Sequence, residues 1–172
     1  MYAKYDTFDT DCAYVFYFGE DNRYDEVYVN NDKSGSKSRI FWRVGNGSND
    51  RSLCEDSTCF ELAWTHVVVT ACGSTMRIYK NGKLSETKTD GQEPKKLTRD
   101  HHCIGCRGSK HSFFKGTVAY LRTWHGHELN GDEVQKLYAA RNSPSLTLAP
   151  GETNGRTRGA KRRSAASSIA RG

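Results

Sequence analysis

Apolar and polar residues alternate with a period of two along much of residues 13–124. Alternation of this kind, rich in β-branched and aromatic side chains, is typical of strands that bury one face. It predicts strands over residues 13–18, 26–30, 39–44, 60–63, 65–71, 75–80, 83–88 and 116–124. Asn81 and Gly82 between two of these strands predict a type I′ hairpin, because both residues adopt positive φ at little cost.

One segment, residues 132–141, has the pattern of a helix. Val134, Leu137 and Tyr138 recur at spacings of three and four, acidic residues occupy the first turn, and Asn130 is suited to be the N-cap. Many strands followed by one short helix predict an all-β protein. We expect an antiparallel jelly-roll sandwich of two sheets.

Composition divides the chain into a folded part and a tail. Aromatic residues make up 11% of the 172 residues, which favours a folded domain over residues 1–147. Residues 148–172 hold six basic residues and one acidic residue and have no periodic pattern, so they predict a disordered basic tail that carries most of the net charge of +6. No stretch is apolar enough to span a membrane. The first residues do not have the pattern of a signal peptide, which leaves the compartment open.

Five segments in order resemble the laminin-G-like jelly rolls of the concanavalin A-like lectin/glucanase superfamily. They are Trp64–Thr70, Met76–Leu84, Ile104-Gly105, Phe114–Trp124 and Glu133–Tyr138. The resemblance implies two curved antiparallel sheets packed face to face. It also implies a non-catalytic module that binds carbohydrate, proteoglycan or protein, often outside the cell and sometimes through Ca²⁺.

The resemblance carries two further expectations about the fold. Trp64 and Trp124 match positions that pack between the sheets of the family. Members usually begin with one or more strands before the segment that residues 4–8 match, so the jelly roll is expected to lack its first strand or strands. The sequence would then be a fragment, or be completed by another chain, with the edge at residues 116–124 left unpaired.

Loops are the expected binding surface, because a rigid sandwich holds them in place while their sequence is free to vary. The predicted binding residues for a glycan or protein are Asp21, Asn22, Asp25, Asn46, Asn49, Arg51, Arg107, Lys110 and His111. Asp25 and Asn31 also carry the oxygen ligands that Ca²⁺ prefers, which makes calcium the one cofactor considered.

The cysteines leave three alternatives open. Cys54 and Cys59 together with Cys103 and Cys106 have a spacing that only partly resembles a four-thiolate zinc site. In an oxidising compartment Cys54 and Cys59 are the expected local disulfide, and otherwise the thiols stay free. An intracellular protein associated with zinc or nucleic acid, using these cysteines and the basic tail, is therefore the alternative function. The tail has no interleaved aromatic residues, so it predicts only weak, salt-sensitive contacts with nucleic acid.

The sequence gives no indication of an enzyme. The Glu-x-Asp-x-Glu pattern, which would place two carboxyl groups on one strand face for glycoside hydrolysis, does not occur. Neither a Gly-x-Ser-x-Gly turn nor a His-Glu-x-x-His helix is present. We therefore predict a non-catalytic binding protein.

Overall fold

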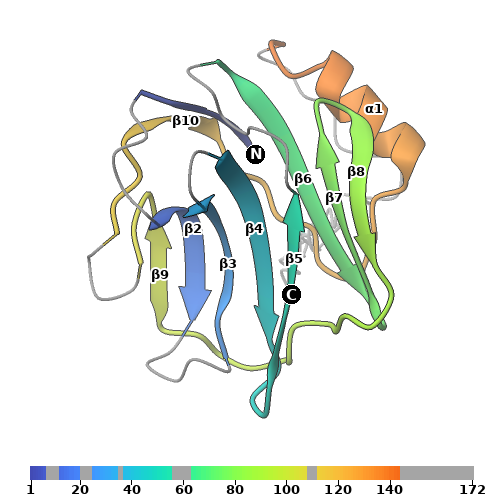
Figure 1. Cartoon of the computed structure of the whole chain (residues 1–172). Helices are drawn as coiled ribbons and strands as arrows, with labels where there is room; N and C mark the ends of the chain where they lie inside the picture. Colours follow the sequence, from blue (N-terminus) through green and yellow to red (C-terminus); the bar gives the residue numbers. More distant parts are fainter. Residues whose placement is uncertain (7–11, 20–24, 35–36, 56–62, 108–111, 144–172) are drawn as a thin grey trace, which may run out of the picture.

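The computed structural model describes residues 1–6, 12–19, 25–34, 37–55, 63–107 and 112–143. Two antiparallel five-stranded sheets pack face to face (Figure 1). The first has the order β10-β1-β6-β7-β8, with β1 Tyr2–Tyr5, β6 Thr65–Cys72, β7 Thr75–Lys80, β8 Lys83–Lys88 and β10 Gly116–Tyr120. The second has the order β5-β4-β3-β2-β9, with β2 Cys12–Gly19, β3 Val27–Ser34, β4 Lys37–Gly45, β5 Asp50–Glu55 and β9 His101–Ile104. The predicted all-β sandwich is confirmed.

Local signals in the sequence account for the turns and the helix. Asn81 (φ 49°) and Gly82 (φ 83°) form the reversal between β7 and β8, as predicted. Helix α1 covers Gly131–Ala139. Its N-cap Asn130 accepts a hydrogen bond from the Glu133 amide, and the Glu133 carboxylate accepts one from the Asn130 amide. This capping box satisfies two amides that would otherwise lack partners.

The main core lies between the two sheets. Alternate residues of both inner faces are buried there, including Ala3, Val15, Val29, Ile40, Trp42, Val44, Val67, Met76 and Ile78. Each strand therefore presents its other set of side chains to the outside of the sandwich. These two outer faces differ, and the difference locates the candidate site.

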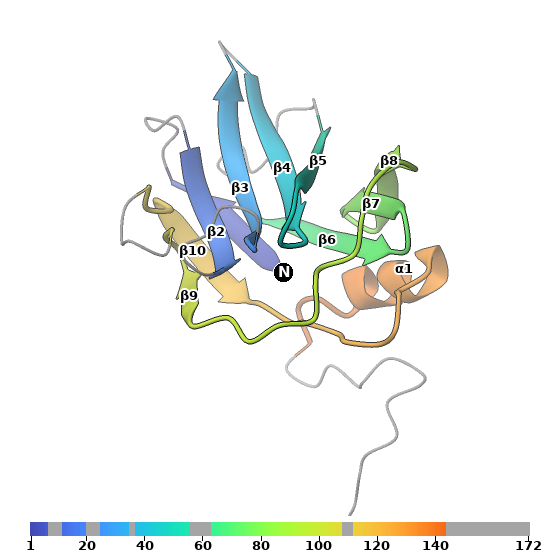
Figure 2. The same cartoon turned by 90° about the horizontal axis from the view of Figure 1, so that it is seen from below.

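Helix α1 covers the outer face of the sheet that contains β6, β7 and β8 (Figures 1 and 2). Val134 and Leu137 of the helix, together with Leu129, pack against Val68 of β6 and Tyr79 of β7. No described element covers the outer face of the other sheet in this way. In the described residues, no helix combines the length and the apolar composition that crossing a membrane requires.

Three expectations about the edges and the tryptophans need correction. Residues 116–120 do have a neighbour, because β1 pairs with β10. Trp64 does not pack between the sheets: 40% of it is exposed, and its ring lies 5.0 Å from that of Tyr2. Trp124 is partly buried, but it packs with the cluster under α1 instead of the main core.

Candidate ligand-binding face

A cluster of aromatic side chains occupies the outer face of the β5-β4-β3-β2-β9 sheet. It is separate from the main core and is not covered by α1. We call it the tyrosine face, and we include in it the polar residues that contact the rings or alternate with them along the strands. Its members are Tyr14, Tyr17, Tyr28 and Phe41, with Glu26, Asn30, Arg43 and Arg107.

An irregularity in β2 brings two of the tyrosines together. The register between β2 and β3 shifts between Tyr14 and Phe16, so Val15 and Phe16 both face the core. A bulge of this kind resets the alternation. Tyr14 and Tyr17, three residues apart, therefore share the outer face. Across the sheet, Tyr28 of β3 pairs with Arg43 of β4.

The rings form a continuous layer across three strands. The Tyr14 and Tyr28 centroids lie 4.8 Å apart, and the Tyr17 and Tyr28 centroids lie 6.3 Å apart in a stacked arrangement. Phe41 extends the layer at 6.4 Å from Tyr28. Contacts at these distances are favourable for aromatic pairs, and they limit the movement of each ring. The layer is therefore rigid, and its three tyrosines are buried, at 3–5% exposure.

Two arginines lie over this layer, each with a carboxylate partner. Arg107 Nη2 donates to Glu26 Oε1 at 2.8 Å, and its guanidinium carbon lies 5.8 Å from the Tyr14 ring. Arg43 Nη2 lies 3.0 Å from Asp50 Oδ2, and its guanidinium carbon lies 5.8 Å from the Tyr28 ring. The Tyr17 hydroxyl also donates to Glu26 Oε1, at 3.3 Å. The charges on this face are thus balanced in pairs.

Burial determines the protonation of these groups. It raises the pKa of Tyr17 to about 12, and the pKa values of Tyr14 and Tyr28 also lie above the usual tyrosine range for the same reason. Burial lowers the pKa of Arg107, but the hydrogen bond to Glu26 and the charge interactions with Tyr14, Glu26 and Tyr17 together raise it by more, so the pKa ends above its ordinary value. At neutral pH the face therefore presents neutral hydroxyls beside charged guanidinium groups.

Two polar atoms on this face retain hydrogen-bonding capacity. Asn30 Oδ1 and Arg43 Nε are buried and have no hydrogen-bond partner in the part of the chain that the structure describes. An unsatisfied buried polar group is costly, so such atoms usually gain a partner from water or a ligand. The pair offers one acceptor and one donor, which matches a ligand that carries hydroxyl groups.

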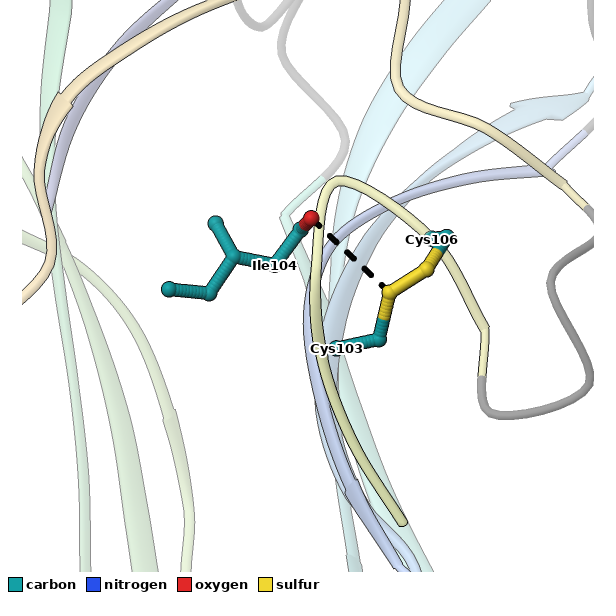
Figure 3. The surroundings of a disulfide bond; sticks show 3 residues. All are labelled: Cys103, Ile104 and Cys106. Carbon is teal, nitrogen blue, oxygen red and sulfur yellow. Dashed lines mark hydrogen bonds between the residues drawn. A yellow bond between two sulfur atoms is a disulfide. The ribbon is translucent and has the colours of Figure 1, made fainter.

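A disulfide anchors the backbone just before Arg107. Cys103 of β9 pairs with Tyr17 of β2, and its sulfur is bonded to that of Cys106 (Figure 3). Because Arg107 follows Cys106 directly, the disulfide restricts the position from which the guanidinium extends over the face. The disulfide also removes two of the four predicted zinc ligands, so that zinc site is wrong. Pairing of Cys54 with Cys59 stays a prediction, since Cys59 lies outside the described residues.

The predicted binding loops are only partly represented on this face. Arg107 lies on it, whereas Asn46 and Asn49 lie in the turn between β4 and β5, and Arg51 lies at the start of β5. The Asn46 side chain accepts hydrogen bonds from two amides of its own turn, those of Ser48 and Asn49. Arg51 donates to the Asp90 carbonyl at 3.1 Å. These interactions stabilise the turn. Asp21, Asn22, Lys110 and His111 lie outside the described residues.

The predicted calcium ligands lie before β3 and within it. Asp25 precedes Val27, and Asn31 follows Val27 after four residues of extended strand, about 13 Å. Calcium binding by Asp25 and Asn31 stays a prediction. Asp25 Oδ1 is buried without a hydrogen-bond partner in the described chain. Among the described residues no group of three or more histidine, cysteine or acidic side chains is arranged to hold a metal.

Sequence reasoning missed most of the tyrosine face because it considered loops and not strand faces. The signal was present in β3 and β4: Tyr28 and Asn30 alternate with Val27 and Val29, and Phe41 with Ile40 and Trp42. Bulky aromatic and charged residues at the outward positions of adjacent strands indicate a functional face. The bulge in β2 concealed the contribution of Tyr14 and Tyr17.

Comparison with known proteins agrees with this architecture. No curated protein matches the chain. Among solved structures, the Ruminococcus gnavus IT-sialidase CBM40 superposes with a TM-score of 0.54 at 15% identity, over 68% of each chain. An S-layer domain-containing protein (residues 221–444) from Clostridium thermocellum ATCC 27405 gives a TM-score of 0.36 at 19% identity, over 78% of this chain and 66% of that one. Residues 1–135 match a laminin G family described as the concanavalin A-like lectin/glucanases superfamily. The chain therefore belongs to the laminin-G-like branch of that superfamily.

Proposed function

We propose that this protein is a non-catalytic carbohydrate-binding module whose ligand lies on the tyrosine face. The observation that carries the proposal is the presence of two arginine–carboxylate pairs beside a fixed layer of tyrosine rings. The three tyrosines are only 3–5% exposed, whereas the Arg107 side chain is 36% exposed, so the polar groups that border the rings are the ones a ligand can reach. Sugars present hydroxyl groups that form hydrogen bonds with arginine, carboxylate and amide groups. The CBM40 neighbour, named as a module of a sialidase, supports the same class of function.

The charge balance of the face supports a preference for neutral hydroxyl groups. Glu26 already accepts hydrogen bonds from Arg107 and Tyr17, and Arg43 is held by Asp50. A neutral hydroxyl can both donate to and accept from such pairs without leaving a charge unpaired. The disulfide next to Arg107 supports a binding module that works under oxidising conditions, and it argues against the zinc alternative.

The test is a glycan array followed by calorimetric titration of the strongest ligand. Arg107→Gln removes the guanidinium over Tyr14, and we expect at least about tenfold weaker binding, which corresponds to about 1.4 kcal/mol. Lys136→Gln on α1 is the matched control, because it removes one positive charge from the covered side and should leave affinity unchanged. Binding that survives Arg107→Gln but disappears in Arg51→Gln would place the site at the β4–β5 turn and contradict the proposal. A protein captured in place of any glycan would contradict the ligand class.

A further inference from the structure

Helix α1 leaves part of the outer face of the first sheet uncovered. The helix lies beside β7 and β8, away from β10 (Figure 1). The uncovered part crosses β1, which is paired on both sides, with β6 and with β10. Aromatic and arginine side chains gather there from the strands and from the end of the helix. We call this region the β1 patch, and its members are Tyr2, Trp64, Tyr120, Arg122, Tyr138 and Arg141.

The rings of the β1 patch are accessible, unlike the buried rings of the tyrosine face. Trp64 is 40% exposed, and Tyr2 and Tyr120 are half-buried. The Tyr2 centroid lies 5.0 Å from that of Trp64 and 6.0 Å from that of Tyr120, so the three rings form one band across β1. A ligand can therefore contact the rings themselves.

The buried ring of His66 joins this band to the end of α1. Its centroid lies 6.4 Å from that of Tyr120 and 5.9 Å from that of Tyr138. Just beyond the helix, Arg141 Nη1 donates to the Tyr138 carbonyl at 2.9 Å, and its guanidinium carbon lies 4.0 Å from the centroid of the Tyr138 ring. Both contacts hold the Arg141 guanidinium at the edge of the patch.

The two arginines of the patch differ from those of the tyrosine face in their partners. The guanidinium carbon of Arg122 lies 5.5 Å from the centroid of the Tyr120 ring. Within the described parts of the chain, neither Arg122 nor Arg141 forms an ion pair, whereas Arg43 and Arg107 each form one. Burial raises the pKa of Tyr120, and the positive charges of Arg122 and Arg141 oppose that increase, so both charges act on this one ring. The patch therefore favours an anionic ligand.

The basic tail begins close to the β1 patch. The described chain ends at Ser143, two residues after Arg141. It continues into residues 148–172, which hold six basic residues and one acidic residue. A ligand with a single negative group could use only the arginines of the patch. A polymer with repeated negative charges could also contact the tail, so the position of the tail favours a polyanion.

We propose that the β1 patch binds a polysaccharide chain that contains uronic acid residues. This second site does not depend on the tyrosine face. The negative faces of aromatic rings attract the C–H groups of a sugar ring, so sugar rings pack on Trp64 and Tyr2. A guanidinium forms two parallel hydrogen bonds with a carboxylate, so the uronate groups bind Arg122 and Arg141. The disulfide supports an oxidising compartment, which favours a polysaccharide over a nucleic acid as the polyanion.

The test is a calorimetric titration of the full chain with a galacturonic acid hexasaccharide at low ionic strength. The fully methyl-esterified hexasaccharide keeps the sugar rings but has no charge, so it should bind at least about tenfold more weakly. Added salt should weaken binding of the acidic form, because exposed charges are screened. Equal affinity for the two hexasaccharides would overturn the proposal. Tighter binding of an oligothymidylate of equal charge would assign the patch to single-stranded nucleic acid and overturn it as well.

Variants of the patch test the rings and the charges separately. Trp64→Ala and Arg141→Gln should each weaken binding at least about tenfold, whereas Trp64→Phe keeps a ring and should lose only about threefold. Lys83→Gln, at an exposed position of β8, is the matched control for one lost positive charge and should change affinity by less than about twofold. Arg107→Gln should leave binding unchanged, so a failure of the tyrosine-face proposal remains distinguishable. Full affinity in both Trp64→Ala and Arg141→Gln would overturn the proposal.

A tail variant separates the patch from residues 148–172. Lys161→Gln, Arg162→Gln and Arg163→Gln together remove three positive charges from the tail of the full chain. We expect about threefold weaker binding and a smaller effect of salt, since fewer cations contact the polymer. Loss of all binding in this variant would assign the ligand to the tail and overturn the proposal. The absence of binding by the unmodified chain would overturn it too.

Discussion

The two outer faces of the sandwich are built differently. On one face, Val134 and Leu137 of α1 bury Val68 and Tyr79, and the contacts are mainly apolar. On the other, tyrosine rings pack among themselves and hold arginines and carboxylates in pairs. The apolar contacts under α1 contribute to stability through buried area, whereas the arginine and carboxylate groups beside the tyrosine rings can also form hydrogen bonds with a ligand. Substitutions on the two faces should therefore separate stability from binding.

The largest effect is expected under α1. Leu137→Ala removes a buried side chain from the helix–sheet contact and should lower the free energy of unfolding by about 2–5 kcal/mol. Glycan affinity should stay unchanged at temperatures where the variant is folded. Urea unfolding followed by fluorescence measures the first quantity, and titration with the array ligand measures the second. A matching loss of affinity would show that the two faces are coupled.

The covered face should also make stability depend on pH. Burial lowers the pKa of His66, whose ring lies 5.9 Å from that of Tyr138, to about 3. Below the ordinary histidine pKa of about 6.5, the unfolded chain binds a proton that the folded state does not, so stability falls as the pH falls. Between about pH 7.5 and about pH 5 this histidine should remove about 2 kcal/mol.

The variant His66→Gln tests the source of this dependence. Glutamine does not titrate, so the decrease in the free energy of unfolding from neutral to acidic pH should become smaller by about 2 kcal/mol. The relevant readout is the free energy of unfolding at about pH 7.5 minus that at about pH 5, compared between the two proteins. Glutamine also changes stability by an amount that does not depend on pH, and this amount cancels in the difference. An unchanged difference would mean that His66 is not the titrating group.

Elements with a strong local signal were predictable from the sequence. The Asn81-Gly82 reversal and the Asn130 cap each depend on two or three neighbouring residues, and both are confirmed. The alternation pattern did not predict β1, β5 and β9 because they are short or polar: β5 has Leu53 as its main apolar residue, and β9 reads His-His-Cys-Ile. Only the family resemblance indicated a strand at Ile104. Pairing with longer neighbours holds these strands in place, and such tertiary pairing leaves no periodic pattern in the strand itself.

The candidate site was harder to predict than the fold. Arg107 was recognised as a binding residue, but Glu26, which orients it, was not, because 81 positions separate the two in the sequence. Trp64 was wrongly assigned to the core for a related reason: its family position predicts burial, yet its neighbour here is Tyr2 on the outside of β1. A pattern along one strand shows which residues share a face. Which residues lie opposite one another on neighbouring strands is known only once the pairing of the strands is known.

A smaller effect is expected at the beginning of α1. Asn130→Ala removes the side chain that accepts from the Glu133 amide at 3.0 Å, and it should lower the free energy of unfolding by about 1 kcal/mol. Asn142→Ala, at an exposed position after the helix, is the control and should change stability by less than about 0.5 kcal/mol. Thermal unfolding distinguishes the two variants. Equal effects would mean that the capping box does not stabilise the helix.

The smallest change in stability should accompany a clear change in binding on the tyrosine face. Tyr17→Phe keeps the ring but removes the hydroxyl that donates to Glu26 at 3.3 Å, so the free energy of unfolding should fall by only about 0.5 kcal/mol. Arg107 then becomes the main partner of Glu26, and glycan affinity should fall about threefold to tenfold because the carboxylate is less well oriented. Tyr79→Phe under α1 is the matched substitution and should leave affinity unchanged. Equal losses of affinity in both variants would contradict the division of roles between the two faces, since only Tyr17 contacts a residue of the proposed site.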